Sequence, residues 1–201
     1  MSNNKLDISL HFLKLSHNYL SLVRNALEEA IKQGNVFVVI KDHKISEKEL
    51  IEETRWSDFN IIVPILYNFY HGLELLMKGS LILIKDYNFK KTHDIKKLLN
   101  DFCTNYKKDI EIIKILNKYA DINLMPKILS KFLKENKINV NKFYIFLRYP
   151  FDKRNEKKFS YYQLHGNEEE GLNLFKEMVS DIDILIPKLV KLYREKEKEN
   201  Q

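Results

Sequence analysis

The sequence predicts an all-α protein, and three observations lead to this expectation. Its 201 residues include only 5 Gly and 4 Pro, too few for the many tight turns of a multi-stranded sandwich. Charged residues make up 31% and hydrophobic residues 44% of the chain, a balance typical of a compact helical protein. Apolar residues also recur at helical spacing in several long segments. We therefore expect a single helical domain over residues 1–195, followed by a frayed charged tail at 196–201.

Long helices are predicted at both ends of this domain. Residues 6–33 have helical apolar spacing, and Gly34 supplies a C-terminal stop. The last helix opens at Asn167, and the glutamates at 168–170 suit the positive end of a helix. Both helices carry apolar faces wider than one neighbour requires, so we expect a symmetric homodimer. These faces contain Leu6, Leu10, Leu13, Leu20 and Leu27 in the first helix, and Leu172, Phe175, Val179, Ile182, Ile186 and Leu189 in the last.

Two short elements are predicted after the first helix. The β-branched residues 36–40 favour a small strand or an extended crossing. Ser46 and Glu49 have the spacing of a capping box, in which each side chain bonds the other residue's backbone N–H. A short helix is therefore expected directly after Ser46.

The central helix is predicted from its apolar composition. It begins between Ser57 and Pro64, because proline is tolerated only near a helix start, and it runs to about residue 85. Thr92 can cap the next helix. Residues 109–147 contain two or three short amphipathic pieces and are interpreted as a helical insertion.

Composition limits the class of partner and cofactor. The formal net charge of +6 favours an anionic partner without identifying one. A single cysteine, Cys103, excludes an intrachain disulfide and fits a reducing, cytoplasmic setting. Because there is no Cys/His cluster, we expect neither a metal site nor a cofactor.

Membrane association is not expected. The N-terminus lacks the basic start and continuous apolar centre of a secretory signal. Residues 61–84 are long enough to span a bilayer, but Glu74 and Lys78 would each cost about 2.5–3.5 kcal/mol near its centre. The segment is therefore interpreted as a buried core helix.

The central helix nevertheless carries a polar face. Offsets of three and four residues place His71, Glu74 and Lys78 on one side. We expect this face to point inward toward His93 and Arg148, with the arginine fork bonding the Glu74 carboxylate. The simpler interpretation is an ordinary ion pair between Glu74 and Lys78, worth about 0.2–0.5 kcal/mol in an isolated helix. His93 would then be a solvated residue at a helix entrance.

Three short motifs carry a family resemblance. HGLELLMKG lies at 71–79, THDIKKLL at 92–99 and LRYPF at 147–151, ahead of the final helix. In this order they resemble the HEPN superfamily of small helical nucleic-acid-associated domains, over residues 58–99 and 148–192. The resemblance implies an up-and-down helical bundle, often dimeric, of the kind found in prokaryotic toxin, antitoxin and phage-defence systems.

Active members of that superfamily are metal-independent ribonucleases with an arginine, four to six arbitrary residues, and a histidine near the last helix. This chain lacks that spacing, and its nearest pair is Arg154 and His165. Such cleavage needs one group to take the 2′-OH proton, one to protonate the leaving oxygen, and a cation on the developing charge. Histidine and arginine suit these roles. The catalytic candidates are Arg148, His93, Glu74, His165 and Arg154.

A loop before the last helix interleaves cations with aromatic rings, as single-stranded nucleic acid requires for charge neutralisation and base stacking. The alternative is an ordinary solvated loop. The nucleic-acid-binding candidates are Lys78, Tyr149, Lys153, Lys157, Lys158, Tyr161 and Tyr162.

Two functions follow from this pattern. The first is a dimeric HEPN-like protein of a cytoplasmic defence or toxin module that acts on RNA as a metal-independent endoribonuclease. The second is a non-catalytic binding or regulatory subunit for an effector or a nucleotidyltransferase-like partner encoded nearby. The missing arginine-to-histidine spacing favours the second function.

Overall fold

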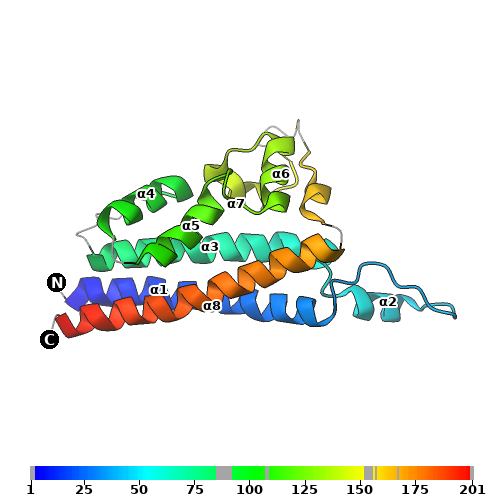
Figure 1. The fold of residues 1–201 in the computed structure, drawn as a ribbon, viewed down its shortest axis with the longest axis horizontal. Coiled ribbons are helices and arrows are strands. Elements are labelled where there is room, and N and C mark those ends of the chain that lie inside the picture. The colour runs from blue at the N-terminus through cyan, green and yellow to red at the C-terminus, as the bar shows by residue number, and fades with distance from the viewer. Residues whose placement is uncertain are drawn as a thin grey trace.

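The chain is all-α, as predicted. The computed structural model describes residues 3–84, 92–106, 109–151, 156, 158–166 and 168–199. Within those residues the only β pairing is an isolated bridge between Phe151 and Lys158. The helices, shown in Figure 1, are α1 (Asn3–Lys32), α2 (Glu47–Thr54), α3 (Asp58–Ile84), α4 (Ile95–Asn105), α5 (Ile110–Ala120), α6 (Lys127–Asn136), α7 (Phe143–Phe146) and α8 (Glu168–Glu199), with short 3-10 helices at η1 (Val140–Lys142) and η2 (Tyr161–Leu164).

In the bundle, α3 lies between two layers of helices. In Figure 1, α1 and α8 run side by side along one face of α3, and the shorter helices α4 to α7 cover the opposite face. This position explains why α3 is so apolar, because neighbours cover it on both sides. None of the described helices is long and apolar enough to cross a bilayer.

The contact between α1 and α3 is close because small residues line it. Gly72 and Gly79 lie two turns apart on α3, and a methyl group added at either position would come within 3.0 Å of a leucine of α1. The hydroxyls of Ser16 and Ser9 donate to the carbonyls of Gly72 and Gly79, each at 2.8 Å. The matching seven-residue spacing on both helices fixes their register over two turns.

The start of α4 differs from the sequence prediction. Asp94, two residues after Thr92, is the N-cap, and its carboxylate accepts the backbone N–H of Lys97 at 2.9 Å. Thr92 instead accepts the N–H of Asp94 at 3.2 Å. Either side chain can cap a helix, and the choice depends on where the chain turns into the bundle. This arrangement holds the intervening His93 at the helix entrance.

Residues 109–147, interpreted from the sequence as a helical insertion, contribute to the core. Phe132 and Phe143 are fully buried, and the hydroxyl of buried Tyr119 donates to Asp181 of α8 at 2.7 Å. At the other end of the chain, α8 stays helical to Glu199. Helix thus extends into the segment where a frayed tail was expected.

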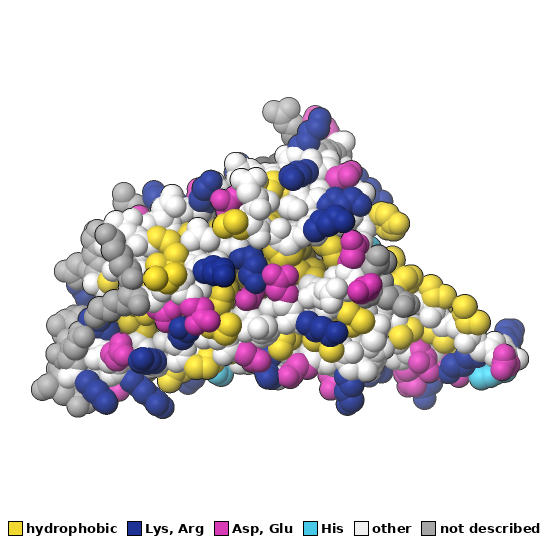
Figure 2. All heavy atoms as spheres, viewed as in Figure 1, with side chains coloured by type: hydrophobic (Ala, Val, Ile, Leu, Met, Phe, Trp, Pro, Cys, Tyr) yellow, Lys and Arg dark blue, Asp and Glu magenta, His cyan; other side chains and the backbone are white. Residues whose placement is uncertain are grey.

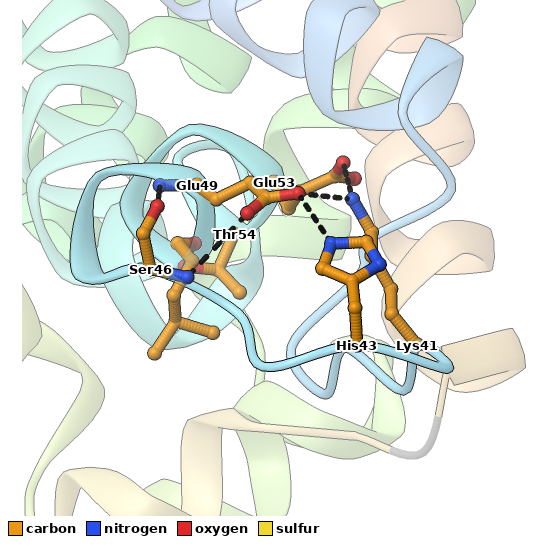
Figure 3. A network of polar contacts seen from close by, with 7 residues as sticks. Lys41, His43, Ser46, Glu49, Glu53 and Thr54 are labelled. Carbon is orange, nitrogen blue, oxygen red and sulfur yellow. Dashed lines mark hydrogen bonds and ion pairs between the residues drawn. The ribbon is translucent and has the colours of Figure 1, made fainter.

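A helical extension projects from one end of the bundle (Figure 1). It carries α2, which buries none of its residues and begins with the predicted Ser46–Glu49 capping box. Polar contacts hold its loop (Figure 3): Lys41 donates to Glu49 and Glu53, each at 3.0 Å. The bond from Lys41 is the main reason that the pKa of Glu49 falls to about 2.

Candidate functional site

Glu74 forms the buried centre of the polar face on α3. Its side chain is 2% exposed, and Lys78 donates to its Oε1 at 2.5 Å from one helical turn away. A buried charge is tolerated when an opposite charge pairs with it, and Lys78 pairs with Glu74 in this way. The prediction that Glu74 and Lys78 point inward is confirmed.

His93 reaches the same carboxylate from the entrance of α4. Its Nδ1 lies 3.1 Å and 3.3 Å from the two oxygens of Glu74. Because a carboxylate only accepts hydrogen bonds, Nδ1 is the donor, and Nε2 of a neutral ring keeps its lone pair. The His93 side chain is 57% exposed. A buried carboxylate therefore orients an imidazole that is exposed to solvent.

A second histidine lies on the same face of α3. His71 packs edge-on against Tyr19, with ring centres 4.7 Å apart, and parallel to Tyr67 at 6.2 Å. Burial lowers the pKa of His71, and the cationic neighbours Arg148 and Lys78 add to this effect while Glu74 opposes it. His71 is therefore neutral at pH 7. Its buried Nδ1 has no hydrogen-bond partner among the described residues.

Arg148 is placed above the aromatic part of this face. Its guanidinium carbon lies 5.2 Å from the ring centre of Tyr67, at cation–π distance. The hydroxyl of Tyr161 lies 2.6 Å from the carbonyl of Phe146 and 2.7 Å from that of Tyr149, which holds the arginine's loop from both sides. The prediction of an ion pair between Arg148 and Glu74 is wrong. Among the described residues, Lys78 and His93 are the ion-pair partners of this carboxylate.

His165 lies at a different place in the fold. Its ring stacks on Phe59 with centres 4.0 Å apart, and its Nδ1 is 3.7 Å from the carboxylate of Asp58. Asp58 and Glu74 are separated by sixteen residues of α3, about 24 Å at the helical rise. His93 and His165 therefore belong to separate clusters within one chain.

The remaining candidates divide by exposure. Lys78 is buried against Glu74, so its ammonium serves that carboxylate and is closed to a surface phosphate. Tyr161 packs parallel to Phe132, whereas Tyr149 and Tyr162 are exposed. Lys158 is exposed and forms the isolated β-bridge with Phe151. Three further candidates, Lys153, Arg154 and Lys157, lie outside the described residues.

Sequence reasoning missed several residues of these two clusters. Tyr67 had a usable signal, because it precedes His71 by one turn on the same helix face. No comparable sequence signal marks Tyr19, or the pair formed by Asn35 and Asp58. Asn35 accepts the backbone N–H of Asp58 at 2.6 Å although 23 residues separate them. Only the packing of α1 on α3 brings such residues together.

No protein-family model matches the chain, and no curated protein or solved structure is significantly similar to it. Among the described residues, no three His, Cys, Asp or Glu side chains are grouped to hold a metal ion. The chain is thus an all-helical protein whose central helix carries a buried carboxylate bonded to an ammonium and a half-exposed imidazole.

Proposed function

We propose that the protein is an RNA-cleaving enzyme whose reaction centres on His93, with Glu74 as its positioning residue. The observation that carries the proposal is the contact between a carboxylate at 2% exposure and an imidazole at 57% exposure. Carboxylate–histidine pairs of this geometry fix the tautomer of the ring and stabilise its charged form during proton transfer. The basic net charge of +6 is compatible with an anionic substrate.

The two histidines flanking Glu74 support complementary roles. In the proposed reaction, neutral His71 takes the proton of a ribose 2′-OH, and the 2′-oxygen attacks the neighbouring phosphorus. The bond from phosphorus to the 5′-oxygen breaks, and His93, starting in its imidazolium form with Nδ1–H on Glu74, donates the proton on Nε2 to that oxygen. The products are a 2′,3′-cyclic phosphate and a free 5′-OH. Arg148, held over Tyr67, supplies positive charge to the phosphorane-like transition state.

Cleavage of a diverse single-stranded RNA pool in the presence of EDTA tests the proposal. We expect His93→Gln to lower the cleavage rate by about 10²–10⁴-fold, the usual contribution of a general acid or base. Glu74→Gln should lower the rate and shift the pH–rate profile, because the acceptor of the His93 ring loses its negative charge. His11→Gln is the matched control, since His11 is exposed on α1 and bonded only to surface Asp7 among the described residues. An intact RNA pool, or equal loss in the control, would rule out His93 as the reacting group.

A specific observation favours the alternative of a non-catalytic subunit. Lys78 already neutralises Glu74, and His165 lies against Asp58, about 24 Å from Glu74 along α3, so the histidine of the pair nearest to the superfamily motif does not join this cluster. In this case the Glu74 cluster fixes α4 and the Arg148 loop to the core for binding. The protein would then bind without cleaving RNA. If the partner is RNA, the logarithm of the binding constant should fall linearly with the logarithm of the salt concentration; the other possible partner is a protein encoded nearby. Salt titration of binding and affinity capture with the neighbouring gene products distinguish these outcomes.

A further inference from the structure

The segment 36–40 presents an unpaired backbone edge. Residues 36–41 contain neither a turn nor a bend, so the chain does not turn sharply there. No backbone N–H or C=O group of 36–40 bonds to any residue that the structure describes. A segment whose main-chain N–H and C=O groups have no protein partner can pair with another strand.

Apolar side chains accompany this edge. Val38 is 58% and Ile40 is 90% exposed, and Leu50, Ile51 and Phe59 are exposed nearby. Figure 2 shows hydrophobic side chains along the upper border of the extension. Exposed apolar residues that gather in one patch are typical of a protein–protein interaction site.

Both ends of the edge are fixed in place. Asn35 is fully buried and bonds the start of α3, while Lys41 is held by Glu49 and Glu53 of α2 (Figure 3). The ring of Phe37 packs on Phe59, with centres 5.2 Å apart. A partner strand therefore meets a segment that is already ordered, which lowers the entropy cost of pairing.

We propose that segment 36–40 pairs antiparallel with the same segment of a second copy of this chain, centred on Val38. In this register Val36 faces Ile40, Phe37 faces Val39, and Val38 faces its own counterpart. Every pair then joins β-branched or aromatic residues, which are favourable across strands. The surface is self-complementary, as a two-fold dimer requires.

Charge supports the antiparallel orientation. Antiparallel pairing places Lys41 opposite Asn35 and Asp42 opposite Gly34. Parallel pairing would instead place Lys41 opposite Lys41 and Asp42 opposite Asp42, and like charges directly opposite destabilise a strand pair. The sequence also predicted a dimer through α1 and α8, but much of that apolar surface, including Leu13, is buried within the chain. The proposal is independent of the proposed RNA cleavage.

Cysteine cross-linking tests the register. In a Cys103→Ser background, Val38→Cys should give a disulfide-linked dimer on mild oxidation, because facing residues of antiparallel strands lie about 4.5–5.5 Å apart. Ile40→Cys alone should cross-link poorly, since it faces Val36, and Val36→Cys combined with Ile40→Cys should restore cross-linking. Equal cross-linking of the Val38 and Ile40 single variants would overturn the proposed register.

Sedimentation equilibrium of the full chain tests the interface itself. We expect Val38→Lys to raise the dimer dissociation constant at least about tenfold, since it puts two ammonium groups opposite each other at the two-fold axis. Leu22→Lys is the matched control, because Leu22 is an exposed apolar residue of α1. The proposal is overturned if the wild-type chain is a monomer at about 100 μM, or if Leu22→Lys dissociates the dimer and Val38→Lys does not.

Discussion

A carboxylate in the middle of a buried helix is unfavourable unless its charge is neutralised. Glu74 meets this requirement through two partners of different kinds: Lys78 lies on its own helix, and His93 comes from the entrance of α4. The lysine is buried with it, whereas the histidine is open to solvent. Glu74 therefore makes two different contacts. Lys78 neutralises its buried charge, and Glu74 in turn orients the exposed imidazole of His93.

The buried pair predicts strongly coupled substitutions. Lys78→Met should lower the free energy of unfolding by about 3–5 kcal/mol, because it leaves the Glu74 charge with less compensation inside the bundle. The double variant Glu74→Leu with Lys78→Met should recover most of this loss, since an apolar pair of similar volume removes both charges. Urea denaturation of the two single variants and the double variant measures the coupling. Additive losses would show that the two side chains do not act as a pair.

His71 predicts a pH dependence of stability. Burial lowers its folded-state pKa below the unfolded value of about 6.5, so the unfolded chain binds the proton more readily. Its contribution is fully present above about pH 6.5 and is lost as the pH falls toward the folded-state pKa. His71→Gln should flatten this part of the profile between about pH 8 and 5.5 in urea denaturation. An unchanged slope in the variant would contradict this assignment.

At the scale of elements, the seam between α1 and α3 governs how the site is held. Ser9 and Ser16 satisfy their hydroxyls on the carbonyls of Gly79 and Gly72, so the helices approach closely without leaving polar groups unpaired. This contact fixes one face of α3, while α4 and the Arg148 loop lie on the other face. The geometry of the Glu74 cluster depends on both.

The glycines of this seam predict a loss of stability on enlargement. Gly72→Ala would place a methyl carbon 2.9 Å from a methyl group of fully buried Leu20. Overpacking of this kind costs about 1–3 kcal/mol, and the better helix propensity of alanine returns about 1 kcal/mol. We expect a net loss of up to about 2 kcal/mol in urea denaturation. Asn100→Ala, at an exposed position of α4, is the control and should change stability by less than about 0.5 kcal/mol.

The whole molecule combines a tightly packed bundle with an extension that has no buried residue in its helix. The extension is instead ordered by surface contacts between Lys41, Glu49 and Glu53. Ion pairs at the surface are weak and screened by salt. The bundle and the extension should therefore respond differently to acid and salt.

Glu49 predicts where this difference is seen. Its pKa is lowered from 4.5 to about 2, first because Lys41 bonds it. Its contribution is present above about pH 4.5 and is lost as the pH falls through about 2. Glu49→Gln should change the fluorescence of Trp56, the single tryptophan of the chain, already at neutral pH. Far-UV circular dichroism and thermal unfolding of the bundle should stay close to wild type. A lower unfolding temperature would show that the extension supports the bundle.

Much of the fold was predictable because its determinants are local. Apolar spacing gave α1, α3 and α8 to within a few residues, and the capping box at Ser46 gave the start of α2. Periodicity also placed Glu74 and Lys78 on one face. The start of α4 was misplaced because Thr92 and Asp94 are both able caps, and the local pattern does not rank them.

The sequence by itself determined the helices and the presence of a polar stripe on the most apolar one, since both follow from spacing along a chain that turns every 3.6 residues. Only the tertiary structure decided that Glu74 is buried, that His93 reaches it, and that Arg148 lies over Tyr67 instead of pairing with Glu74. It also separated His165 from His93 and left 36–40 without a backbone partner among the described residues. Contacts between residues far apart in sequence depend on how helices pack against each other, and packing is set by the shapes of many side chains together.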